Sequence, residues 1–271
     1  MKRLTVLFFV VLFLLAFVSC KDKQSEAPKI PKDSQLDFFS EHSDDYRAGG
    51  REEQFMMPND ETAVMLASKI DYYLDHINCK NILPDFDDIK KVTDAKPFLN
   101  LAKLRTPSVD LNKLENYPDN PVTKLVQKLR EEGNSVESVW YKSDVLETLV
   151  RLFGENARDN KNFTNFTGNL DFCEYYPEED VYIMLGALGG TAAIPQVISY
   201  EKSEVGYVCE AFIYNSYAVD PWQDAPVKIK ADYENHSENY PVYKYTFDDG
   251  MVLTKFEIIR DKDISQYGIS K

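Results

Sequence analysis

The side chains that most often carry catalytic chemistry are few in this sequence and lie far apart. The histidines are His42, His76 and His236, and the serine motif Gly-x-Ser-x-Gly is absent. The most glycine-rich stretch, residues 185–191, precedes a predicted strand and contains no lysine. A phosphate-binding loop would lead into a helix and carry a lysine. The sequence therefore predicts no catalytic constellation and no cofactor.

Two acidic runs could supply oxygen ligands to a calcium ion. They are Asp85-Phe86-Asp87-Asp88 and Pro177-Glu178-Glu179-Asp180. The first departs from the pattern Asp-x-Asp-x-Asp-Gly, because Ile89 and Lys90 occupy the positions of the third oxygen ligand and the turn glycine. A loose calcium contact is the alternative to solvated loop acids, and we predict no metal centre.

The first 26 residues have the layout of an export signal. Two positive charges, on Lys2 and Arg3, precede an apolar run from Val6 to Val18, and Ser19 and Cys20 lead into a polar segment. The apolar run is shorter than a membrane-spanning helix requires. We therefore predict a signal peptide over residues 1–19.

The junction Phe17-Val18-Ser19-Cys20 resembles the lipobox of bacterial lipoproteins. A small residue and an aliphatic residue precede the cysteine, while Phe17 stands where that family usually has leucine. The resemblance implies that Cys20 carries a diacylglycerol thioether and becomes the mature N-terminus. The protein would then be anchored by lipid to the cell membrane, facing outside the cytoplasm. Cleavage with release and an uncleaved anchor are the alternatives.

The charge balance restricts the class of partner. The chain has 31 basic and 45 acidic residues, and its net charge is −14. Such a surface repels nucleic acid and anionic lipid headgroups. We therefore expect the membrane to be contacted only through the lipid on Cys20, and we expect the partner to be an unknown protein or glycan rather than nucleic acid.

Three cysteines remain if Cys20 carries lipid. They are Cys79, Cys173 and Cys209. Cys173 and Cys209 fall in the same predicted β-rich region and are the pair we propose for a disulfide. The alternative is that all three are buried thiols that behave as small apolar side chains.

Helix signals dominate the first half of the body. Residues 20–55 are charged and proline-bearing and predict a disordered, lipid-anchored tether, and residues 56–135 form a predicted helical region. Apolar periodicity and caps predict helices over 60–78, 87–92, 98–104 and from Asp119-Asn120-Pro121 to Gly133. A further helix, capped by Ser143 or Asp144, is predicted over 144–153 at the start of a second region, 136–262.

Strand signals follow Gly154. Residues 181–185, 197–201, 207–214, 227–233, 243–247 and 252–258 are predicted strands, and Asp248-Asp249-Gly250 is a hairpin turn. Because the predicted helices precede the strands and do not alternate with them, the fold class is α+β. We expect N-terminal helices packed on a C-terminal antiparallel β-meander that runs from about residue 170 to 260.

A second resemblance covers residues 143 to 260. It rests on the run from Val145 to Gly154, on Tyr175-Tyr176-Pro177-Glu178-Glu179-Asp180 and on the hairpin that begins Tyr243-Lys244-Tyr245. This part of the chain is similar to uncharacterised lipoproteins of Gram-positive bacteria. That family has no settled activity, so the resemblance implies a cellular location and a domain but no reaction.

Aromatic residues crowd the predicted sheet and the loop after it. Tyr207, Tyr214, Tyr217 and Trp222 are the candidates for a binding surface, because amphipathic rings suit a partner or a sugar. The alternative is that these tyrosines simply pack in strands. We therefore predict a non-enzymatic, lipid-anchored binding or envelope-interaction module. The alternative is an extracytoplasmic hydrolase that uses carboxylates at the mouth of the sheet.

Overall fold

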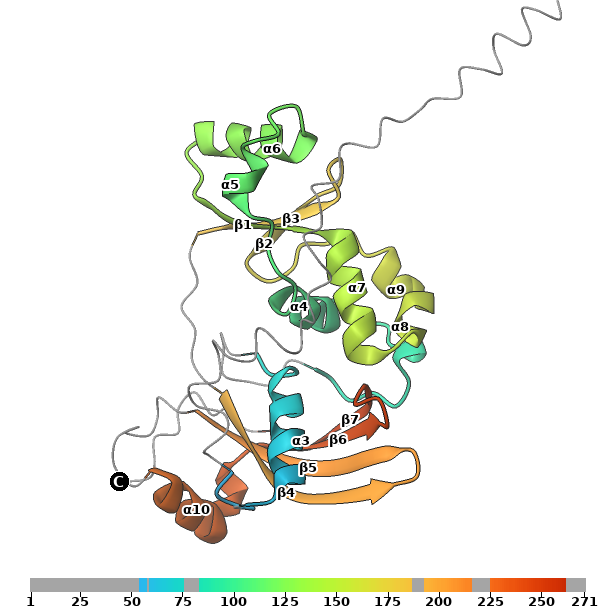
Figure 1. Ribbon diagram of the computed structural model, residues 1–271, viewed down its shortest axis with the longest axis vertical. Helices are drawn as coiled ribbons and strands as arrows, with labels where there is room; N and C mark the ends of the chain where they lie inside the picture. Colours follow the sequence, from blue (N-terminus) through green and yellow to red (C-terminus); the bar gives the residue numbers. More distant parts are fainter. Residues whose placement is uncertain (1–53, 58, 76–82, 187–192, 216–224, 262–271) are drawn as a thin grey trace, which may run out of the picture.

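The computed structural model describes residues 54–57, 59–75, 83–186, 193–215 and 225–261, and these form the predicted α+β fold. The strands make two antiparallel sheets (Figure 1). The three-stranded sheet has the order β1-β3-β2, with β1 Val136–Tyr141, β2 Cys173–Tyr176 and β3 Val181–Leu185. The four-stranded sheet has the order β4-β5-β6-β7, with β4 Ala193–Ser203, β5 Gly206–Asn215, β6 Val242–Asp248 and β7 Leu253–Arg260.

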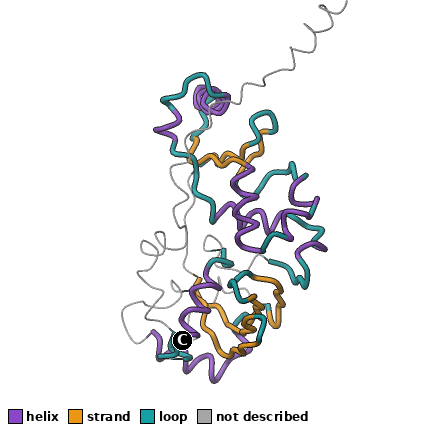
Figure 2. The backbone as a smooth tube through the Cα atoms, turned by 45° about the vertical axis from the view of Figure 1, so that its right-hand side comes forward, coloured by secondary structure: helices purple, strands orange, loops and turns teal. Residues whose placement is uncertain are grey.

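The helices precede, connect and cover these sheets. They are α3 Glu61–Asp71, α4 Lys96–Leu104, α5 Leu111–Leu114, α6 Pro121–Glu131, α7 Lys142–Phe153, α8 Asn156–Asp159, α9 Lys161–Thr164 and α10 Ala225–His236. Single 3-10 turns cover Ile89–Lys91 and Ser237–Asn239. The two sheets lie apart from each other with α4 and α7 between them (Figures 1 and 2).

Local capping chemistry sets most helix starts. Asp60 accepts hydrogen bonds from the N–H groups of Thr62 and Ala63 at the start of α3, and Asn120 caps α6 ahead of Pro121, as predicted. The predicted cap of α7 is wrong. That helix begins at Lys142, so Ser143 and Asp144 lie inside its first turn, and no side chain caps it.

The three-stranded sheet has two different faces because side chains alternate along each strand. Val139, Val181 and Ile183 pack with Val122 and Val126 of α6 on one face. Trp140, Tyr182 and Cys173 belong to the larger core that includes α4 and α7. Accordingly, α5 and α6 lie on one side of the sheet and α4 and α7 on the other (Figure 1).

The four-stranded sheet is covered in the same way. Cys209, Ala211 and Ile213 of β5 share the core with α3, which contacts β4. Phe212 and Tyr214 point to the opposite face, where they pack with Ile229 of α10. The sheet therefore has a helix against each face.

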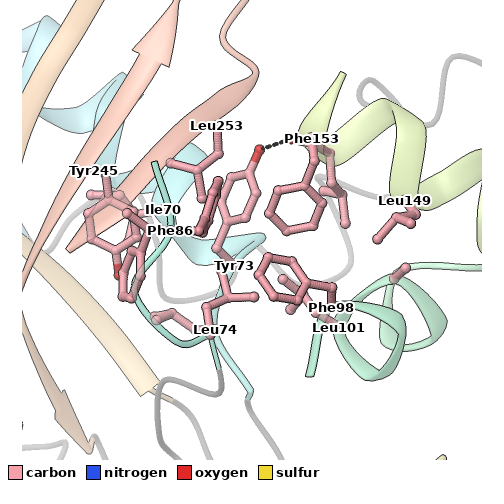
Figure 3. Close-up of a cluster of buried hydrophobic side chains, with 14 of the residues drawn as sticks. Ile70, Tyr73, Leu74, Phe86, Phe98, Leu101, Leu149, Phe153, Tyr245 and Leu253 are labelled. Atoms are coloured by element: carbon pink, nitrogen blue, oxygen red, sulfur yellow. Dashed lines mark hydrogen bonds between the residues drawn. The ribbon is translucent and has the colours of Figure 1, made fainter. Parts of the chain in front are cut away.

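One aromatic cluster joins the four-stranded sheet to the helices between the sheets (Figure 3). The rings of Phe86, Phe98 and Phe153 meet edge to face at centroid distances of 5.3–5.8 Å. Tyr73 packs against Phe153 and Phe247 and donates a hydrogen bond of 2.8 Å to the carbonyl oxygen of Leu152. The predicted regions 56–135 and 136–262 therefore share one core.

Several predicted elements differ from the observed ones. Residues 227–233 lie in the helix α10, which connects the paired strands β5 and β6. The predicted single meander is instead two sheets, because β2 and β3 pair with β1 and not with β4–β7. The strand prediction for residues 227–233 was wrong because the spacing of four between Ile229 and Tyr233 also places both side chains on one face of a helix. β1 was not predicted, and the predicted helix over 87–92 is only a 3-10 turn. Helix α3 ends at Asp71, and residues 76–78 of its predicted span lie outside the described residues.

Candidate functional site

The residues predicted to form an aromatic surface do not come together on one face. Tyr207 and Tyr214 are an odd number of positions apart on β5, so their side chains lie on opposite faces of the sheet. Tyr214 is buried beside α10, whereas Tyr207 is half-buried against the main core. Tyr217 and Trp222 lie outside the described residues. The prediction of a surface that contains both Tyr207 and Tyr214 is therefore wrong.

The predicted disulfide between Cys173 and Cys209 is also wrong. Both residues are free, buried thiols, and they lie in different sheets, on β2 and β5. Burial raises the pKa of Cys209 to about 12. Burial also raises the pKa of Cys173, although the nearby Lys103 acts in the opposite direction. Cys20 and Cys79 lie outside the described residues.

The acidic residues near the four-stranded sheet act mainly as structural acceptors. Asp248 accepts from the N–H of Val252 at 2.8 Å in the hairpin, and Asp85 accepts from the N–H of Ile258 on the edge strand β7. Among the described residues, no group of three or more histidine, cysteine, aspartate or glutamate side chains could hold a metal ion. These contacts favour a structural role for the carboxylates.

Side chains of α4 support the tight turn before β2. We call residues 170–173 the Asp171 turn. Its Asp171 receives three side chains of α4: the backbone N–H donates to Asn100 Oδ1 at 2.8 Å, the carbonyl accepts from Lys103 Nζ at 2.8 Å, and the carboxylate pairs with Lys96 Nζ at 2.9 Å. Positions 96, 100 and 103 fall on one face of a helix with 3.6 residues per turn. Helix α4 therefore fixes the backbone and the side chain of Asp171 together.

Phe172 stands at the exposed tip of this turn. Its φ is +61°, in the left-handed region that bulky residues rarely adopt, and 52% of the residue is exposed. The N–H of Cys173 closes the turn on the carbonyl of Leu170 at 3.1 Å. A non-glycine residue in this conformation costs roughly 1–2 kcal/mol, so the surrounding contacts hold the turn in a strained form.

Two tyrosines follow Phe172 on the edge strand β2, and their side chains lie on opposite faces of the sheet: Tyr175 packs against the main core and Tyr176 against the core that includes α6. Tyr175 donates to Asp180 at 2.6 Å and Tyr176 donates to Glu174 at 2.9 Å. Partial burial and these carboxylates raise the pKa of both hydroxyls to about 12. We call residues 172–176 the aromatic rim. The rim therefore has an exposed phenyl ring at its tip and one tyrosine–carboxylate pair on each face of the sheet.

The outer edge of β2 is partly protected from pairing with another strand. The N–H of Tyr175 donates to Asn169 Oδ1 at 2.9 Å, and the N–H of Cys173 is used within the turn. Because these backbone donors are occupied, contact at the aromatic rim depends on side chains rather than on strand addition.

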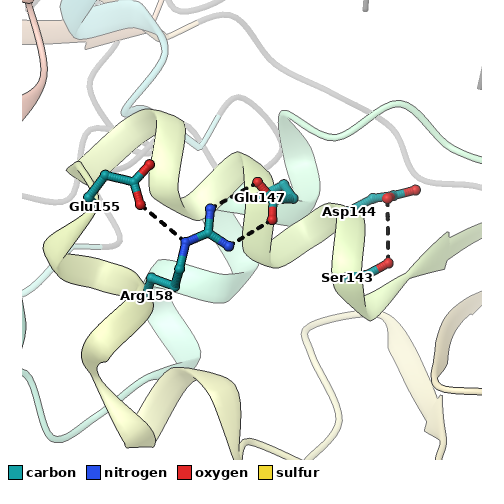
Figure 4. A network of polar contacts seen from close by, with 5 residues as sticks. All are labelled: Ser143, Asp144, Glu147, Glu155 and Arg158. Atoms are coloured by element: carbon teal, nitrogen blue, oxygen red, sulfur yellow. Dashed lines mark hydrogen bonds and ion pairs between the residues drawn. The ribbon is translucent and has the colours of Figure 1, made fainter.

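A separate polar network on α7 and α8 has a structural explanation (Figure 4). Arg158 donates to Glu147 at 2.9 and 3.2 Å and to Glu155 at 3.1 Å. These hydrogen bonds raise the pKa of the guanidinium. All of these side chains are exposed, so salt screens the network and it serves to hold α8 against α7.

Sequence reasoning missed Phe172, Lys96, Asn100 and Lys103. The available signal was within α4, where Asn100 and Lys103 interrupt an otherwise apolar run. Buried amide and ammonium groups need partners, and these partners lie about seventy residues further along the chain.

Comparisons of the chain with family models, curated proteins and solved structures find no match. None of the helices in the described part of the chain is both long and apolar enough to span a membrane.

Proposed function

We propose that this protein is a lipid-anchored, extracytoplasmic binding protein. Cys20 attaches it to the membrane, residues 20–55 tether the body, and the aromatic rim contacts a protein or glycan partner in the cell envelope. The attachment rests on the export signal and on the lipobox-like junction at Cys20.

The observation that carries the binding surface is the exposed, left-handed Phe172. A half-exposed phenyl ring does little for the core, and its backbone conformation is costly. Three side chains of α4 nevertheless hold the turn that presents it. Preorganised aromatic groups of this kind are typical anchors of binding surfaces.

Anchoring is tested on the mature protein by mass spectrometry of its N-terminus. We expect cleavage before Cys20 and a mass increase that corresponds to bound acyl chains. In Cys20→Ser, the chain should keep its signal peptide and lack the lipid. A mature N-terminus elsewhere, or an unmodified Cys20, would contradict the anchoring.

Binding is tested with an envelope preparation from the source cells and full-length protein in detergent. Phe172→Gly should bind at least tenfold more weakly, whereas Val205→Ala, which alters an exposed apolar residue on the β4–β5 turn, should bind normally. The free energy of unfolding of Phe172→Gly should stay unchanged or rise by up to about 1 kcal/mol, because glycine accepts the left-handed conformation. Equal binding by both variants would exclude the aromatic rim, and a large loss of stability in Phe172→Gly would make Phe172 a packing residue.

The alternative of a hydrolase with carboxylates at the mouth of the sheet stays a prediction. No specific contact among the described residues favours it over binding.

A further inference from the structure

A buried lysine and a buried cysteine lie against each other between α4 and β2. Lys103 Nζ is 3.6 Å from Cys173 Sγ, and the two residues are only 2% and 4% exposed. Lysine is almost never fully buried without partners. Lys103 also donates to the carbonyl of Asp171 and lies 5.7 Å from the centre of the Trp140 ring. The amine is therefore held in place beside the thiol.

Burial changes the reactivity of the thiol in this pair. Burial raises the pKa of Cys173, and this effect outweighs the opposing effect of Lys103. A thiol in this state is a poor free nucleophile towards solutes, and its burial excludes large reagents. The group held against the thiol is the amine of Lys103, at 3.6 Å.

A third buried group completes the cluster. Tyr182 of β3 pairs across the sheet with Tyr175 and Trp140, so it is a diagonal neighbour of Cys173 on the same face. Its hydroxyl is buried and has no hydrogen-bond partner in the structure. A buried donor without a partner is costly, and an added oxygen atom between Lys103 and Cys173 would supply an acceptor to this side of the sheet.

We propose that Lys103 and Cys173 form a reversible covalent cross-link in which one oxygen atom bridges Nζ and Sγ. The oxidant is dioxygen. After Lys103 Nζ gives up its ammonium proton to water, the amine loses one N–H bond and the Cys173 thiol loses its S–H bond, while new N–O and O–S bonds form to one oxygen atom. The second oxygen atom leaves as water with the two hydrogens. Two equivalents of a dithiol reverse the reaction and return the amine, the thiol and one water.

The cross-link would join the helix that supports the Asp171 turn to the strand that follows it. Lys103 and Cys173 are 70 positions apart in the chain, so the link closes a long loop and restricts the unfolded state. We expect the oxidised form to melt about 5–10 °C above the reduced form. The proposal is independent of the proposed binding function, because it concerns only the chemistry of the pair.

The test uses the full-length protein, divided into an air-oxidised sample and a sample reduced with dithiothreitol under nitrogen. Intact-mass measurement of the oxidised sample should show the gain of one oxygen atom and the loss of two hydrogen atoms. Peptide mapping should join the peptide of Lys103 to that of Cys173, and dithiothreitol should remove both signals.

Variants identify the residues. Lys103→Arg keeps a positive charge but should lose the cross-link, and so should Cys173→Ser. Cys209→Ser is the matched control, since it removes the other described buried thiol and should leave the cross-link intact. The wild-type peptide map tests the proposal even if a variant fails to fold. The proposal is overturned if oxidised protein carries no link between these peptides, if the link lacks the oxygen atom, or if Cys173 is oxidised to a sulfinic acid instead.

Discussion

The hydroxyl of Tyr73 joins the two halves of the core, and its removal should weaken the whole fold. Leu152 is in the last turn of α7, where helix carbonyls have no partner within the helix. The Tyr73 hydroxyl donates to this carbonyl at 2.8 Å (Figure 3). With its ring against Phe153 of α7 and Phe247 of β6, Tyr73 thus connects the segment after α3 with α7 and the four-stranded sheet.

In Tyr73→Phe the ring remains and only this hydrogen bond is lost. The packing against Phe153 and Phe247, at centroid distances of 5.7 and 5.9 Å, should persist. A buried carbonyl group that loses its partner costs about 1–3 kcal/mol. We therefore expect the free energy of unfolding to fall by about 1–3 kcal/mol. For a chain of this size, Tm should fall by about 3–10 °C.

The measurement is urea-induced unfolding at neutral pH with circular dichroism and fluorescence, and Tyr245→Phe is the matched control. Tyr245 is fully buried on β6, but its hydroxyl has no hydrogen-bond partner. Its removal should leave stability unchanged or raise it by about 1–2 kcal/mol, because a buried polar group disappears. The same substitution should therefore lower stability at Tyr73 but not at Tyr245. Equal losses of stability at Tyr73 and Tyr245 would refute this reasoning.

The remaining predictions concern a glycine and a carboxylate. Gly206→Ala should be strongly destabilising, by about 3 kcal/mol or more, because Gly206 has a φ of +134° and an added Cβ would lie 2.0 Å from the carbonyl oxygen of Phe247; a soluble variant with wild-type Tm would contradict this. Desolvation alone would raise the pKa of Asp171, but the hydrogen bond and charge of Lys96 outweigh it and lower the pKa below its ordinary value of 3.8. Asp171 should therefore stabilise the fold above about pH 4, and this stabilisation should be lost as the pH falls through the lowered pKa. In unfolding curves measured between neutral and acidic pH, Asp171→Asn should lack this part of the acid sensitivity, and an unchanged pH profile would show that the Asp171–Lys96 contact does not contribute.

Local signals predicted the elements whose stabilising contacts lie close in sequence. Asn120 and Pro121 predicted the start of α6, and the turn Asp248-Asp249-Gly250 predicted the hairpin between β6 and β7. A cap or a two-strand turn is decided within a few residues. The same holds for the end of α7 at Gly154, which has a φ of +83°.

Elements decided by distant partners were mispredicted. In residues 227–233, apolar and polar side chains alternate as they would in a strand. The ring of Tyr233 nevertheless stacks on the ring of Phe212 with a centroid distance of 4.1 Å, and Ile229 is buried beside it. Packing against the sheet therefore favours the helix. The spacing of Ile229 and Tyr233 is compatible with either structure. The sequence alone could not decide between helix and strand, because Phe212 contacts this segment only in the folded chain.

The candidate site was less predictable than the fold for the same reason. Nothing near Lys103 in the sequence indicates that the carbonyl of Asp171 or the thiol of Cys173 will lie beside it. The prediction of a disulfide for Cys173 assumed one sheet where there are two. A buried lysine is visible in the sequence only as a charge inside an apolar helix, which indicates that a partner exists but does not identify it.

The tyrosines show why an excess of aromatic residues was a poor indicator of a binding surface here. Tyr240 donates to Asp232 at 2.7 Å and Tyr243 donates to Asp261 at 3.3 Å, while their rings are buried. A tyrosine can thus fill a core and still satisfy its hydroxyl at the edge, which suits a sheet covered on both faces. Phenylalanine has no polar tip that would justify partial exposure. The half-exposed Phe172, held in a strained turn, is therefore a stronger indicator of contact with a partner than the more numerous tyrosines.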